Sequence, residues 1–314
     1  MTNVIAKQIA LFINISIKAG TPLLLASLGE IYAERSGILN LGLEGIMLVG
    51  AVTGFILAHS TGNPLIGIIV SLLAGALMGL MHAFVCVTLR ANQVVAGLAL
   101  VMIGTGLSSL LGRSYVGVAL EKPLRPLKIP VLSEIPILGE GFFYHDILIY
   151  TSYVLVPLLW FILYKTKVGI QIRAVGENPA AADSMGVNVY LIRYACTIFG
   201  GSLAGLAGAY ISLAYTPMWM EGITVGKGWI ALALVIFAMW DPLRAVLGAY
   251  LFGTTDVLQY WLQMPLQRRG IDPSILGTLP YIATIIALLI GSFERIRKRI
   301  GAPASLGKPY VRGE

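Results

Sequence analysis

Residues 29–51 read GEIYAERSGILNLGLEGIMLVGA, and three acids, one arginine and one asparagine lie here between two apolar runs. Glycines flank these polar residues repeatedly, and glycine lets a backbone turn sharply or approach another group closely. Charge and irregular backbone near membrane depth are tolerated only where they are buried in protein or line a wet cavity. The stretch therefore predicts either such a buried polar site or a cytoplasmic loop with a local Glu34–Arg35 pair and helix-capping acids.

The rest of the chain consists mainly of apolar runs. Hydrophobic residues make up 57% of the sequence and charged residues 12%, whereas a soluble domain carries about 25% charged residues. A spanning helix needs about 20 mainly apolar residues, and such runs lie at 8–29, 42–58, 65–89, 93–112, 147–164, 191–214, 225–240, 243–262 and 278–293. We therefore expect an all-α, polytopic transmembrane bundle of about nine (8–10) helices that forms one domain over residues 1–314.

Some of these segments are expected to be broken or to re-enter the membrane. The run 225–240 is short and ends at Asp241-Pro242, and a proline disfavours helix at the residue before it. Small-residue spacing elsewhere predicts that helix backbones approach closely in lipid; it occurs at Gly75 and Gly79, and at Gly201, Gly205 and Gly208.

The orientation follows from the distribution of basic residues, because lysine and arginine are enriched on the cytoplasmic side. Two basic segments are therefore placed in the cytoplasm: residues 165–193, with Lys165, Lys167, Arg173 and Arg193, and the tail 294–314, with Arg295, Arg297, Lys298, Arg299, Lys308 and Arg312. Nine crossings then put the N-terminus and the segment 113–146 outside. Four basic residues in that outer segment oppose this assignment, so an inverted or ten-helix topology remains the alternative; they are Arg113, Lys122, Arg125 and Lys128.

Several function classes lack their usual residues. The net charge of +7 fits the positive-inside rule better than nucleic-acid binding, because the basic residues lie between apolar runs. The two cysteines form no CxxC pair and the three histidines lack metal-ligand spacing, so no metal site is expected. Neither Gly226-Lys227 nor Gly307-Lys308 belongs to a P-loop, so we expect no enzyme activity and no bound cofactor in this chain.

The polar stretch 168–194, VGIQIRAVGENPAAADSMGVNVYLIRY, predicts a short helix across the cytoplasmic face. Asn178 is suited to cap a helix whose first residue is Pro179, and alanines follow as strong helix formers. Gly186 is suited to end it. An exposed helix with a small-residue face fits a groove on a partner, although a plain amphipathic loop is the alternative.

These residues carry a family resemblance. The stretch 177–186 resembles the EAA-type coupling motif of ATP-binding-cassette permeases, which implies that residues 166–190 form the coupling segment; the residues that match are Glu177, Asn178, Pro179, Ala181, Ala182 and Gly186. The runs ERSGILNLGLEGIMLVGA (34–51) and GKGWIALALVIFAMWDPLRAVLGAYLFG (226–253) look like permeases for branched-chain amino acids, simple sugars and nucleosides.

Within that family, the run 38–45, ILNLGLEG, is similar to the nucleoside-type permeases. The resemblance implies a multi-pass subunit of the cell (inner) membrane that works with an ATPase subunit, which binds ATP and magnesium, a second homologous permease chain and an extracytoplasmic substrate-binding lipoprotein. The segment 113–146 is expected to meet that lipoprotein. A sugar or branched-chain amino-acid permease of the same family remains the alternative, followed by an ion-coupled secondary carrier.

Polar groups that are costly in lipid are the candidates for the substrate path. A nucleoside suits amide and carboxylate hydrogen bonds together with an aromatic face for the base. The candidates are Asn40, Glu44, Asn92, Gln93 and Trp229. Trp229 also fits the aromatic belt at a membrane interface.

Overall fold

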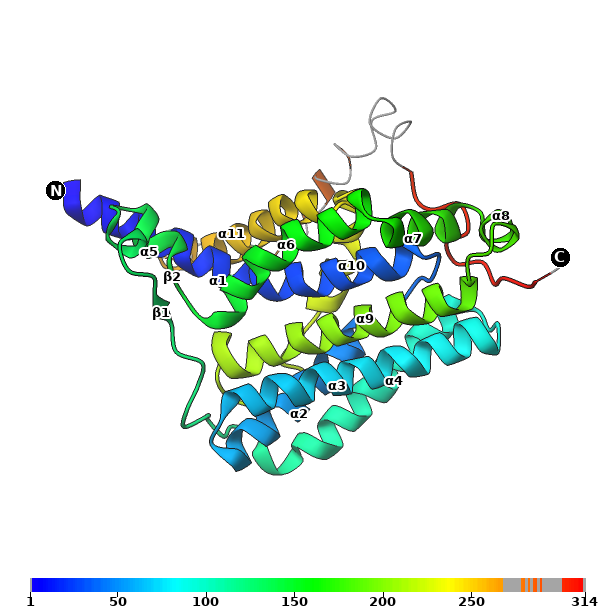
Figure 1. Ribbon diagram of the computed structural model, residues 1–314. Helices are drawn as coiled ribbons and strands as arrows, with labels where there is room; N and C mark the ends of the chain where they lie inside the picture. Colours follow the sequence, from blue (N-terminus) through cyan, green and yellow to red (C-terminus); the bar gives the residue numbers. More distant parts are fainter. Residues whose placement is uncertain are drawn as a thin grey trace.

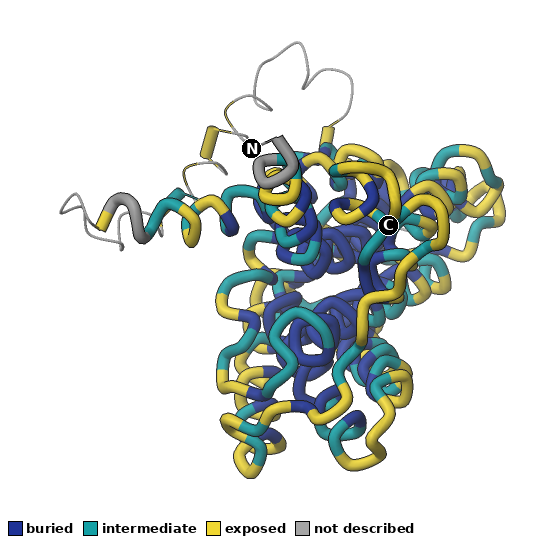
Figure 2. Tube along the Cα trace, turned by 90° about the vertical axis from the view of Figure 1, so that its left-hand side faces the viewer, coloured by how far each residue is buried: buried dark blue, intermediate teal, exposed yellow. Residues whose placement is uncertain are grey.

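The computed structural model describes residues 2–267, 278–279, 282, 285–286, 289 and 301–312. The described chain is mostly helical, and its only strands form one two-stranded antiparallel ribbon, in which β1 (Leu127–Lys128) pairs with β2 (Tyr144–His145). The expected all-α bundle is therefore confirmed. Figure 1 shows the long helices packed along a common direction, and Figure 2 shows the buried residues running through the interior.

Eleven α-helices follow one another along the described chain, and the longest connection between them is residues 113–137. They are α1 (Thr2–Arg35), α2 (Leu43–Thr61), α3 (Pro64–Ala83), α4 (Gln93–Gly112), α5 (Leu138–Phe142), α6 (Ile147–Lys165), α7 (Lys167–Glu177), α8 (Pro179–Ser184), α9 (Val189–Tyr210), α10 (Lys227–Phe237) and α11 (Pro242–Gln267). A π-helical turn extends α3 over Phe84–Thr88, and another extends α9 over Ile211–Tyr215.

Six of the predicted membrane segments are helices that are long and apolar enough to cross a bilayer: Ala6–Arg35, Leu43–Thr61, Pro64–Thr88, Gln93–Tyr115, Ile147–Lys165 and Val189–Tyr215. The run 243–262 lies in α11, which has 26 residues. The run 225–240 forms only the 11-residue α10, as the prediction of a half-helix requires. The ninth run, 278–293, lies largely outside the described residues, as do four of the basic residues of the tail: Arg295, Arg297, Lys298 and Arg299.

The two ends of the bundle differ in what they carry. In Figure 1, α5, β1 and β2 lie at the end that holds the N-terminus, whereas α7, α8 and the C-terminus lie at the opposite end. Arg35 lies at this second end, where its guanidinium donates to the carbonyls of Met239 and Trp240. The α7–α8 end is therefore the one that the basic residues assign to the cytoplasm.

Glycines set the distance between α2, α3 and α9. A Cβ atom on Gly75 would lie 2.2 Å from the carbonyl oxygen of Gly201, and one on Gly50 would lie 2.2 Å from that of Gly205. These helices touch backbone to backbone, which confirms the close packing that the glycine spacing predicts. Van der Waals packing of this kind associates helices in a solvent as apolar as leucine.

We expect Gly205→Val to lower the free energy of unfolding by roughly 1–3 kcal/mol or to prevent folding, because its side chain would enter the contact with Ser71 and Gly75 of α3. Thermal unfolding in detergent can be followed by thiol labelling, since Cys86 and Cys196 are both buried. Gly106→Val is the matched control, because a Cβ there meets nothing within 4 Å. Equal unfolding temperatures for the two variants would contradict the packing argument.

Candidate functional site

The polar stretch after α1 is buried in protein, as the first of its two interpretations predicts. Glu30 and Asn40 are 0% and 1% exposed, and a Glu30 carboxylate oxygen accepts a hydrogen bond from the Asn40 N–H at 2.9 Å. The Leu39 N–H donates to the Gln93 side chain at 2.7 Å, and the Leu39 carbonyl accepts from the His82 ring at 2.9 Å. The connection 36–42 is thus an irregular segment whose backbone is satisfied by side chains from α1, α3 and α4.

The alternative of a local Glu34–Arg35 pair is wrong. The Glu34 carboxylate accepts a hydrogen bond from the Trp240 indole, and Arg35 donates to the backbone carbonyls that follow α10. Both residues therefore hold the connection between α10 and α11. Met239 and Trp240 have positive φ angles of 52° and 56°, a conformation that costs a non-glycine residue about 1–3 kcal/mol and persists only where neighbours hold it.

Glu44 holds the opposite end of α10. Its carboxylate accepts hydrogen bonds from the Gly228 N–H at 2.7 Å, from the Gly226 N–H at 3.2 Å and from the Thr224 hydroxyl. The first N–H groups of a helix have no intrahelical partner, and the helix dipole favours negative charge beside them. Glu44 supplies both the acceptors and the charge for a helix that begins inside the bundle.

The five predicted path residues fall into two groups. Asn40, Glu44 and Gln93 are buried together around the connection 36–42, where Asn40 accepts from the Gly42 N–H at 3.0 Å. Asn92 is exposed and caps α4 by accepting from the Val94 and Val95 N–H groups. Trp229 is 42% exposed on α10. The structure thus brings three of the five together and leaves Asn92 and Trp229 on the surface.

We call the buried polar groups around the connection 36–42 and the two ends of α10 the polar junction: Glu30, Glu34, Asn40, Glu44, Gln93, Thr224 and Trp240. The last two were missing from the sequence-based set. Thr224 and Trp240 are buried and bind the carboxylates of Glu44 and Glu34. Both lie about 180 residues or more from their partners, so spacing along the chain could not reveal them. The only available signal was the run TVGKG at 224–228, whose glycines leave backbone N–H groups accessible.

The segment 166–190 contains the predicted short helix, α8. The Asn178 side chain accepts from the Ala181 N–H at 3.0 Å, Pro179 opens α8, and Gly186 follows it with a φ of +82°. The predicted cap and stop are therefore confirmed. Ala182 is buried against Val175, Val189 and Tyr310, whereas Met185 is 83% exposed and Ala181 is exposed beside it.

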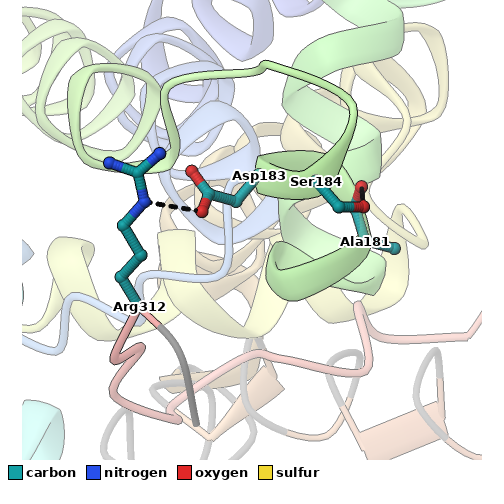
Figure 3. A network of polar contacts seen from close by, with 4 residues as sticks. All are labelled: Ala181, Asp183, Ser184 and Arg312. Carbon is teal, nitrogen blue, oxygen red and sulfur yellow. Dashed lines mark hydrogen bonds and ion pairs between the residues drawn. The ribbon is translucent and has the colours of Figure 1, made fainter.

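The C-terminal strap, residues 301–312, holds the buried side of this segment. The Ser305 hydroxyl donates to the Gly176 carbonyl at 2.7 Å, and the buried Arg193 donates to Ser305 and to the Lys308 carbonyl. The strap ends beside α8, where Arg312 pairs with Asp183 at 2.9 Å (Figure 3). Glu177 accepts from the Ala304 N–H at 3.4 Å. The buried face of α8 is thus occupied by its own chain, whereas no residue that the structure describes covers Ala181 or Met185 on the other face.

The segment 113–146 is folded against the opposite end of the bundle. Its Gly117 and Leu120 N–H groups donate to the carbonyls of Trp219 and Pro217, and Asn14 of α1 donates to the Glu140 carbonyl at 2.7 Å. His145 is fully buried here. Burial and, to a lesser extent, the nearby Lys18 charge lower the pKa of His145 to about 4, so its imidazole is neutral at physiological pH.

We expect Glu44→Gln to lower the free energy of unfolding by roughly 1.5–3 kcal/mol, because an amide nitrogen would replace one acceptor of the charged hydrogen bonds to α10. Thermal unfolding in detergent measures the effect. Glu221→Gln is the control, at an exposed position in the segment that leads into α10. This variant should unfold like the unmodified chain. An unchanged unfolding temperature for Glu44→Gln would show that the carboxylate does not hold α10.

The comparisons with known proteins agree with this architecture. A protein of Haloferax volcanii, provisionally named as a glucose ABC transporter permease, is 41% identical over 96% of this chain and 97% of its own length. The guanosine ABC transporter permease of Bacillus subtilis is 34% identical over 99% of both chains, and the nucleoside ABC transporter permease of Lactococcus lactis is 34% identical over 94% of both. No solved structure matches the chain.

Residues 12–292 match the family described as the branched-chain amino acid transport system / permease component. The match covers the polar junction, the coupling segment and α10, and the buried helices fit a protein that passes the membrane several times. The chain therefore belongs to this family and is a membrane-spanning permease of the ATP-binding-cassette transporters.

Proposed function

We propose that this chain moves a nucleoside inward by alternating access, driven by ATP hydrolysis on a partner subunit. The observation that carries the proposal is the exposed face of α8, a capped helix at the end that the basic residues assign to the cytoplasm, whose other face is held by its own chain. A free small-residue helix face of this kind fits a groove on another protein. In this proposal the groove belongs to an ATP-binding-cassette ATPase, which carries the ATP and magnesium.

A continuous set of contacts supports a route for the movement. A Cβ atom on Gly176 of α7 would lie 2.1 Å from the Arg35 carbonyl oxygen, so the coupling segment touches the end of α1. Arg35 and Glu34 in turn hold Met239 and Trp240 after α10. A displacement of α8 would therefore reach α10 through α7 and α1. Alternation also requires that the substrate bind the two access states differently.

The substrate is proposed from resemblance. Two of the similar permeases are named for guanosine or nucleosides and one for glucose, and the run 38–45 is similar to the nucleoside type. A simple sugar is therefore the second candidate. Asn40, Glu44 and Gln93 would shape the wall of the path from within the polar junction, with Asn92 and Trp229 at its surface.

The partners follow from the same proposal. The permease would pair with a second homologous permease chain, and the folded segment 113–146 would receive a substrate-binding lipoprotein outside the membrane. Residues of this segment present exposed apolar side chains, among them Val131 at 76% exposure, which suit a protein contact better than water.

We expect Ala181→Glu to reduce both ATP-dependent uptake and the stimulation of the ATPase by at least about tenfold, because a charge would enter the docking face without a partner. Reconstituted vesicles that hold the complete transporter measure both quantities. Gln171→Glu, an equally exposed change on α7, is the control. Substitutions of Glu177 and Gly186 are expected to uncouple ATP hydrolysis from uptake. Unchanged transport in all of these variants would contradict the assignment of residues 166–190 to ATPase coupling.

Uptake of a labelled ribonucleoside into the same vesicles tests the substrate. We expect unlabelled nucleosides to compete with it and glucose not to compete, since a pocket built to hydrogen-bond one substrate leaves polar groups unpaired with another. Uptake of labelled glucose without uptake of the labelled ribonucleoside would favour the sugar alternative. Full uptake by this chain without ATPase and nucleotide would instead indicate a secondary carrier.

A further inference from the structure

One ion pair lies within the bundle and takes no part in the polar junction. The Lys227 ammonium at the start of α10 lies 3.9 Å from the Asp256 carboxylate of α11. The same ammonium lies 5.8 Å from the centre of the Tyr215 ring. Tyr260, one helical turn beyond Asp256, is 61% exposed. A cation, an anion and aromatic rings are thus gathered where α10, α11 and the end of α9 meet.

The pair lies at membrane depth. Lys227 precedes Gly228, whose N–H donates to Glu44, and the neighbouring Gly45 packs against Leu100 near the middle of α4. Asp256 lies fourteen residues after Pro242 at the start of α11, or about 20 Å along the helix at 1.5 Å per residue. Both positions are therefore well inside a hydrocarbon layer about 30 Å thick.

The two charges retain hydrogen-bonding capacity. A distance of 3.9 Å is too long for a direct hydrogen bond, and within the described residues neither side chain makes another one. The side chains are 20% and 28% exposed. Ionisable groups that stay partly exposed at membrane depth face a wet cavity or a protein partner rather than lipid.

We propose that Lys227 and Asp256 contact the hydroxyl groups of the permeating substrate, and that the Tyr215 ring packs against the face of its sugar ring. The inference rests on the proposed function, because it takes a nucleoside or a simple sugar as the substrate. Both classes carry neighbouring hydroxyls, which donate to a carboxylate and accept from an ammonium. The face formed by α10 and α11 is then the side of this chain that borders the path.

The role proposed for Lys227 and Asp256 differs from the structural role of the carboxylates in the polar junction. Glu44 and Glu34 already have partners in the two ends of α10, and they hold the half-helix in place. Lys227 projects from the first turn of that half-helix, so the same helix would present a cation to the substrate. A shift of α10 between the two access states would move Lys227 relative to Asp256 and alter the contact.

Transport by the complete reconstituted complex tests the proposal, with the binding protein saturated so that its own selectivity does not enter. The maximal uptake rate is measured for a ribonucleoside and for its 2′,3′-dideoxy analogue. We expect Asp256→Asn to reduce the ribonucleoside rate about tenfold or more, and the rate for the analogue by less than about twofold, since the analogue lacks the hydroxyls that the carboxylate would accept. Leu258→Ala on the same helix is the control and should leave both rates unchanged.

A charge-swapped variant, Lys227→Asp with Asp256→Lys, separates this role from a structural one. If the pair only joins α10 to α11, the swap restores the ion pair and transport recovers for both substrates, which overturns the proposal. Equal losses for the two substrates in Asp256→Asn overturn it as well. The proposal is supported if Asp256→Asn and the charge-swapped variant both lose the difference in uptake rate between the ribonucleoside and its dideoxy analogue. Absence of ATP-dependent nucleoside and sugar uptake by the unmodified complex would instead reject the proposed function itself.

Discussion

The fold depends on how a helix that begins inside the bundle satisfies its first N–H groups. Water is not available there in the way it is at a soluble helix end, and an unsatisfied backbone group in hydrocarbon costs several kcal/mol. The Glu44 carboxylate accepts from two N–H groups at the start of α10 and from the Thr224 hydroxyl. This single side chain allows α10 to be a half-helix, and it fixes the start of α2 against it.

The far end of α10 is held by the same kind of interaction from a different helix. Glu34 and Arg35 end α1, and they bind the indole and the carbonyls of the two left-handed residues, Met239 and Trp240. The half-helix is therefore clamped between α1 and α2, which are themselves joined by the buried connection 36–42. Because α1 also touches α7 at Gly176, the helix that holds the end of α10 is in direct contact with the segment 166–190.

The short helix α8 depends on its surroundings for its stability. A six-residue helix is too short to be stable alone in water, and α8 gains its support from the Asn178 cap, the apolar contacts of Ala182 and the C-terminal strap. These contacts use one face only. Among the described residues nothing covers the opposite side of the helix, where the Ala181 methyl group and the longer Met185 side chain are exposed.

The sequence by itself determined the bundle, the half-helix before Pro242, the glycine contacts and the Asn178 cap, because each depends on hydropathy, propensity or spacing within a few residues. Only the tertiary structure decided where the carboxylates act. Glu34 and Glu44 accept hydrogen bonds from Trp240 and Thr224, which are about 180 residues or more away along the chain. Lys227 of α10 pairs with Asp256 of α11. Such pairings follow from how the helices pack in three dimensions, which no local pattern records.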